Sequence, residues 1–135
     1  MPELSSYDYA IVRVVPSLER GEFVNAGIIL FAQSDRFLAA RVELDEQRLA
    51  ALAADRDAAE IREHLASVER ICIGGDAAGP IGRLSASQRF HWLVAPRSTM
   101  IQMSPVHSGL CEDPAIELDR LFERLVSPGA RVDES

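Results

Sequence analysis

The chain has 135 residues, of which 47% are hydrophobic and 26% are charged, values typical of one soluble globular domain. The 21 Asp and Glu residues outnumber the 14 basic residues and give a formal net charge of -7, opposite in sign to proteins that bind nucleic acid or anionic membranes through overall charge. All 14 basic residues are Arg, which excludes mechanisms that need a catalytic lysine.

The first third of the chain has the pattern of three strands. Aromatic and β-branched residues predict a strand over Tyr7–Val15, which Pro16 ends. The continuous apolar run Ala26–Gln33 predicts a strand buried on both faces. Alternating apolar residues over Phe37–Leu44 predict a half-exposed strand with Arg41 on its polar face. The short connections between the three indicate an antiparallel meander.

The middle of the chain changes to helical spacing. Asp45 is the predicted N-cap of a short helix. Asp57 and Glu60 have the spacing of a capping box, and the apolar residues that follow predict an amphipathic helix over 58–73. Four glycines and a proline in Gly74–Gly82 then predict a mobile loop.

The last third contains one ambiguous segment and one clear helix. Ser85–Ala95 fits both a strand and a short helix capped by its serine, and we favour a helix at its start. Thr99–Met103 has the composition of a further strand. Asp113 as N-cap and Pro114 at the first helical position begin a helix with an apolar stripe.

Together these elements predict an α+β fold over residues 1–129, followed by a short polar tail over 130–135. We expect a small antiparallel sheet, made of the three-stranded meander plus one or two later strands, with two or three helices packed on one face. The start of the chain has no signal-peptide pattern, and no apolar run is long enough to span a membrane. Cys72 and Cys111 form no C-x-x-C pair, so we expect reduced thiols and a cytoplasmic protein.

Arg13 is a charged residue on the predicted apolar face of the first strand. Because burying a lone charge is costly, Arg13 either forms an ion pair with Glu22 or Glu43, lies at an exposed face, or binds an anion. Glu22 and Asn25 bracket the entry to the apolar strand. Asn25 has the position of a turn residue, and a ligand role for the pair is the alternative.

A second polar cluster runs from residue 89 to residue 109. It contains Arg89, His91, Arg97, Ser98 and His107, and prolines restrain its backbone. Arginine binds phosphate or carboxylate in a bidentate manner, so this composition fits an oxyanion or phosphate site as well as it fits a satisfied loop. The histidines lack metal-ligand spacing, and we expect neither a metal nor a cofactor. The acidic total argues against a nucleic-acid partner.

Five stretches of the sequence resemble an uncharacterised bacterial family, the domain of unknown function DUF3037. They are Tyr7–Pro16, Glu22–Phe31, Arg89–Leu93, Pro96–Thr99 and Ser104–Leu110. The resemblance covers nearly the whole chain and brings no established activity or catalytic residue. It implies a partner, because members of this family often occur beside a kinase resembling the HipA toxin group.

The leading hypothesis is an accessory or binding module that recognises an anionic group, a small anionic ligand or a partner's carboxylates, through an Arg and His surface. Its predicted residues are Arg13, Glu22, Asn25, Arg89, His91, Arg97, Ser98 and His107. The alternative is a small enzyme acting on a phosphorylated or acyl substrate. In that case His107 or His91 is the general base, and Arg97 stabilises developing negative charge.

Overall fold

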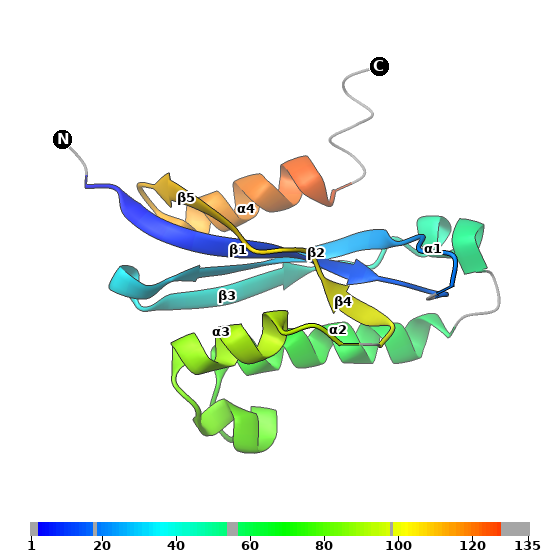
Figure 1. The fold of residues 1–135 in the computed structure, drawn as a ribbon, viewed down its shortest axis with the longest axis horizontal. Coiled ribbons are helices and arrows are strands. Elements are labelled where there is room, and N and C mark those ends of the chain that lie inside the picture. The colour runs from blue at the N-terminus through cyan, green and yellow to red at the C-terminus, as the bar shows by residue number, and fades with distance from the viewer. Residues whose placement is uncertain (1–2, 18, 54–56, 98, 128–135) are drawn as a thin grey trace.

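The computed structural model describes residues 3–17, 19–53, 57–97 and 99–127, and within them five strands form one antiparallel sheet (Figure 1). The strands are β1 (Ser5–Val14), β2 (Val24–Ala32), β3 (Phe37–Val42), β4 (Ile101–Met103) and β5 (His107–Cys111). The sheet order is β3-β2-β1-β4, and β5 pairs with the first half of β1, beside β4 on the second half. The predicted meander with one or two later strands is confirmed.

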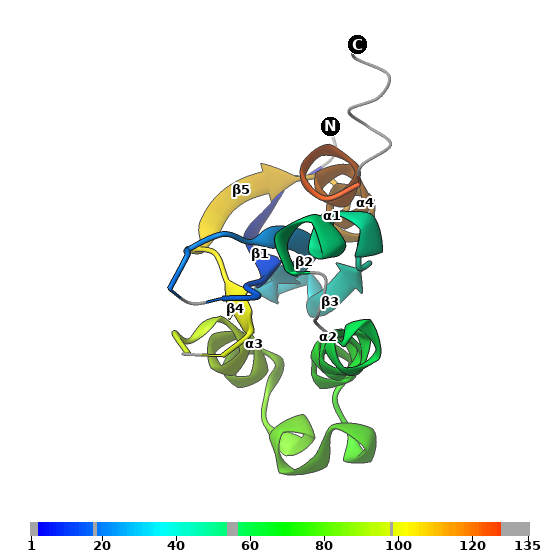
Figure 2. The same ribbon diagram turned by 90° about the vertical axis from the view of Figure 1, so that its right-hand side faces the viewer.

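Helices cover both faces of this sheet. They are α1 (Glu46–Ala53), α2 (Ala58–Ile73), α3 (Ala86–Val94) and α4 (Pro114–Leu125), with short 3-10 helices η1 (Gln33–Asp35) and η2 (Asp76–Arg83). Figure 2 shows α2 and α3 on one face and α4 on the other. Within the described ranges, no helix combines the length and the apolar character needed to cross a bilayer.

The two-sided arrangement follows from β2, whose apolar run has no polar face. Ile29 and Phe31 belong to the core beneath α2 and α3, whereas Ile28 and Leu30 belong to the core beneath α4. The α+β class is therefore confirmed. The helices were predicted to pack on one face of the sheet, and this part of the prediction is wrong. Helices pack on both faces, because a strand that is apolar on both sides must be covered on both sides.

β3 is covered on the side that its sequence pattern left to solvent. The guanidinium of Arg41 lies 4.1 Å from the centre of the Phe122 ring and is 3.2 Å from the carboxylates of both Asp119 and Glu123 on α4. A long arginine side chain can cover apolar surface while its charged head stays hydrated. The polar face of β3 is thus a docking face for α4.

The predicted helix starts are confirmed by their capping contacts. The carboxylate of Asp57 accepts hydrogen bonds from the first turn of α2, and Asp45 does the same for α1. Ser85 and Gln88 form a capping box, which resolves the ambiguous segment as the helix α3. Local caps of this kind need no tertiary partner, which is why the sequence predicts them well.

The glycine-rich segment after α2 was predicted to be a mobile loop, and that prediction is wrong in part, since it contains η2. The amide of Gly75 donates to the carbonyl of Gly82 across this segment (2.9 Å). A Cβ atom on Gly82 would lie 2.0 Å from the carbonyl oxygen of Gly75. The glycines therefore permit a close backbone approach rather than only flexibility.

Candidate functional site

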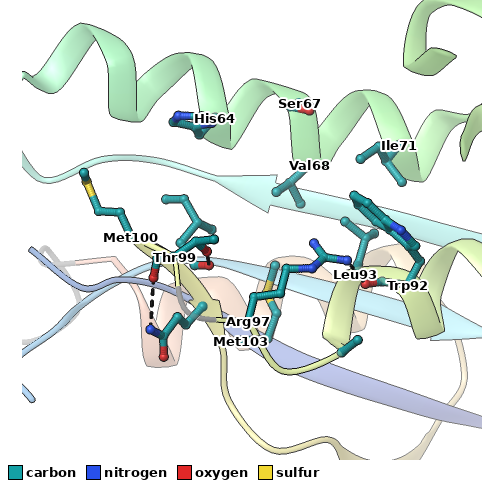
Figure 3. A pocket seen from close by; sticks show the side chains of 13 residues that line it. His64, Ser67, Val68, Ile71, Trp92, Leu93, Arg97, Thr99, Met100 and Met103 are labelled. Atoms are coloured by element: carbon teal, nitrogen blue, oxygen red, sulfur yellow. Dashed lines mark hydrogen bonds between the residues drawn. The ribbon is translucent and has the colours of Figure 1, made fainter. Parts of the chain in front are cut away.

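A groove of about 240 Å³ lies between α2 and the segment that joins α3 to β4. Figure 3 shows His64 and Val68 of α2 along one side and Trp92 and Arg97 along the other. Val68 and Leu93 belong to the core on this face of the sheet. The groove thus has an apolar floor with polar groups at its rim, the usual build of a small-ligand site.

Arg97 is the cationic group of this groove. Its guanidinium lies 3.8 Å from the centre of the Trp92 ring and donates a hydrogen bond to the Trp92 carbonyl. Among the residues that the structure describes, no carboxylate forms an ion pair with Arg97. The indole ring and one carbonyl therefore orient a positive charge without neutralising it.

The opposite rim of the groove carries His64. Its Nε2 lies 3.8 Å from a carboxylate oxygen of Glu60, one turn earlier on α2, a spacing at which side chains on a helix meet. Towards the end of the groove, Gln102 donates a hydrogen bond to the Thr99 carbonyl (2.9 Å; Figure 3). Neither of these two contacts involves Arg97.

Arg13 lies on the other face of the sheet, so it does not share the groove. Its guanidinium stacks on the Phe23 ring at 4.2 Å, and Glu22 pairs with Arg20 instead. The predicted ion pair of Arg13 with Glu22 or Glu43 is absent from the described part of the chain. A β-bulge lies between residues 12 and 13, next to this arginine.

Asn25 is directly opposite Arg13 in the strand register. Its Nδ2 donates to the Leu125 carbonyl at the end of α4 (3.1 Å). Its Oδ1, like Nε of Arg13, is buried without a hydrogen-bond partner among the described residues. Asn25 thus connects β2 to α4, and the turn role expected of it is replaced by a position inside the strand.

Arg89 binds backbone carbonyls. Its guanidinium donates to the carbonyls of Ile71 and Cys72 at the end of α2 and to that of Leu84 before α3. The last carbonyls of a helix have no partner within the helix, so a cation placed there stabilises it. The contacts of Arg89 are those of a structural residue.

The remaining predicted residues do not meet Arg97 either. Nδ1 of His91 contacts the Ser87 carbonyl within α3 (2.7 Å). The ring of His107 packs 5.3 Å from that of Tyr9, on the α4 face. Ser98 lies outside the described residues. The sheet therefore separates Arg13, Asn25 and His107 from Arg97, because side chains of a strand alternate between its faces. His91 lies on the same face as Arg97 but is bound within α3.

The sequence interpretation missed a polar network between β1 and α4. The Tyr7 hydroxyl donates to Glu117 (2.6 Å), which also accepts two hydrogen bonds from Arg120. Burial and the neighbouring Glu117 raise the pKa of Tyr7 to about 12. The hydrogen bond from Arg120 lowers the pKa of Glu117. Gly109 makes room for this contact, since a Cβ there would lie 2.8 Å from the Tyr7 hydroxyl.

Replacing Tyr7 with Phe is expected to destabilise the protein by about 1.5 kcal/mol at pH 7, the lower end of the range for a hydrogen bond to a charged group. The raised pKa makes this contribution complete below pH 10.0, and it is lost as the pH rises through about 12. Urea unfolding from pH 7 to 12 measures it. If the difference in free energy of unfolding between wild type and variant stays constant over this range, the Tyr7 hydrogen bond does not depend on the ionisation of Tyr7.

No group of three or more His, Cys, Asp or Glu side chains that could hold a metal ion occurs in the described ranges. A family model described as "Protein of unknown function (DUF3037)" matches residues 9–126. Neither the curated proteins nor the solved structures include a match.

Proposed function

The chain belongs to the DUF3037 family, whose description names no activity, and we propose that it is a binding module. Its ligand would be a small anion with a short apolar chain, held in the groove between α2 and the α3–β4 segment. The observation that carries this proposal is Arg97, a cation stacked on Trp92 above an apolar floor with no carboxylate partner in the described part of the chain.

The dimensions of the groove favour a short ligand. Its volume of about 240 Å³ lies just below the range of roughly 300–1,000 Å³ for pockets that hold drug-sized ligands. Val68, Leu93 and Met103 supply apolar contacts. The head group is anionic because an arginine with free donors pairs best with carboxylate or phosphate. Both heads fit this chemistry, so the test includes both.

Trp92 is the single tryptophan of the chain and lines the groove, so its fluorescence reports occupancy directly. We expect octanoate or octyl phosphate to change this fluorescence in a saturable way, and 1-octanol to do so more weakly. The pair of anionic probes distinguishes a carboxylate ligand from a phosphate ligand. If neither probe binds, the proposal is wrong.

Replacing Arg97 with Gln is expected to weaken binding of the better probe by about 10- to 100-fold, because charge-assisted hydrogen bonds contribute roughly 1.5–3 kcal/mol. Calorimetry measures this, since the substitution also changes the surroundings of Trp92. Arg83→Gln is the matched control, because Arg83 is an exposed arginine outside the groove. Equal affinity of wild type and Arg97→Gln would contradict the role of Arg97.

The enzymatic alternative has less support from the geometry. It assigns the general base to His91 or His107, and neither of these lines the groove. The histidine that does line it, His64, lies on the rim opposite Arg97 and contacts Glu60. The partnership with a HipA-like kinase and a cytoplasmic location remain predictions that rest on the resemblance and on the sequence.

A further inference from the structure

The outer edge of β5 lies at the margin of the fold (Figure 2). β5 pairs with β1 along one edge, and no other strand of the described residues pairs with it. Edge strands of soluble proteins are usually protected by charged residues or proline. His107–Cys111 contains no Asp, Glu, Lys, Arg or Pro. Its free backbone groups are therefore open to pairing with another extended chain.

Apolar side chains accompany this open edge. Leu110 of β5 is 64% exposed, and Val106 before the strand is 44% exposed. Leu4, just before β1, is 58% exposed. Leu110 is opposite Ser6 in the register, so alternation along β1 places Leu4 on the same face as Leu110, in the diagonal position. The edge thus carries a small apolar strip.

Carboxylates surround the strip. Asp8 accepts a hydrogen bond from Ser108 (2.6 Å), and Asp35 accepts one from Ser5 (2.8 Å). Glu112 and Asp113 follow β5 directly. Arg36, next to Asp35 in the chain, offsets only part of this charge.

The buried thiol of Cys111 reports the same negative surroundings. Burial raises its pKa, and the carboxylates of Glu117, Asp35 and Asp113 raise it further. Glu117 is paired with Arg120, so the unpaired negative charge at this end comes from the other carboxylates. A partner that docks along β5 meets a negative potential.

We infer that the free edge of β5 is a docking surface for an extended segment of a partner protein in which basic residues alternate with apolar ones. Backbone pairing extends the sheet, the apolar residues cover Leu110 and Leu4, and the basic residues meet the carboxylates. A second copy of this chain fits less well, since it brings the same carboxylates to the same edge. The inference is independent of the groove.

The test uses three fluorescein-labelled peptides with blocked ends. The first has the sequence Arg-Val-Arg-Val-Arg-Val, the second replaces its central Val with Pro, and the third replaces every Arg with Glu. Fluorescence anisotropy at physiological ionic strength gives the affinities. We expect the first peptide to bind at least about tenfold more tightly than the other two, because it alone combines strand pairing with charge complementarity. Hydrogen exchange should show protection of the β5 amides.

Leu110→Lys is expected to weaken binding of the first peptide by about tenfold, because an edge lysine blocks strand addition and repels a basic chain. Ile73→Lys is the matched control, since Ile73, the last residue of α2, is 81% exposed and outside the sheet, and it should leave the affinity unchanged. Equal binding of the first peptide and the proline peptide would overturn the inference. A dimer in sedimentation equilibrium that Leu110→Lys dissociates would overturn it in favour of a second copy.

Discussion

Replacing Arg89 with Met is expected to lower the free energy of unfolding by about 3 kcal/mol, near the upper end for one substitution. Its guanidinium donates to three carbonyls, at 2.8 Å to Ile71, 2.6 Å to Cys72 and 3.0 Å to Leu84. The loss would leave the end of α2 without its cap and detach α2 from α3.

Urea unfolding followed by circular dichroism measures this effect. Arg97→Met is the informative comparison, since Arg97 is a half-buried arginine bound to a single carbonyl, and it should change stability by less than about 1 kcal/mol. The two substitutions thus distinguish a structural role for Arg89 from a ligand-binding role for Arg97. An Arg89→Met variant that is as stable as wild type and no longer binds octanoate would reverse that assignment.

Replacing Phe90 with Ala is expected to have the second large effect, a loss of about 3–5 kcal/mol. The Phe90 ring is 1% exposed and stacks on Phe31 of β2 with 5.3 Å between ring centres. Truncation removes the apolar contact between α3 and the sheet and leaves a cavity in the core. Because α3 carries Trp92, the groove is expected to lose its shape as well.

Two further variants give this prediction its controls. Phe90→Leu should retain most of the stability, because it preserves much of the volume. His91→Ala, the next residue on the same helix and exposed, should change stability by less than about 0.5 kcal/mol. If Phe90→Ala and His91→Ala unfold at the same urea concentration, the packing of α3 does not depend on the Phe90 ring.

Part of the candidate site was predictable from composition alone. Arg97, in a segment restrained by prolines, was one of the arginines whose surroundings fitted an anion site, and in the structure it lines a groove. Arg89 is also an arginine and lies only eight positions before Arg97, yet its side chain caps the end of α2. The sequence does not show this difference, because two of the three carbonyls that Arg89 binds belong to residues 17 and 18 positions earlier.

The Tyr7–Glu117 contact shows more clearly which contacts cannot be predicted from the sequence. Its partners are 110 positions apart, and no local pattern brings them together. Tyr7 alone indicated only a strand residue, and Glu117 only a first-turn acid of a helix. A glycine within a strand indicates a close approach by another group, but no strand was assigned from the sequence to the segment that contains Gly109.

The amino-acid order by itself determined the elements of this protein: the meander, the caps of α1, α2 and α4, and the doubly apolar β2. Those features depend on residue spacing and on capping contacts between residues a few positions apart in the chain. Tertiary structure alone decided the placement of α4 on the second face, the separation of Arg13 and His107 from Arg97, and the open edge of β5. Each depends on strand register between distant segments, and a one-residue shift of register moves a side chain to the opposite face of the sheet.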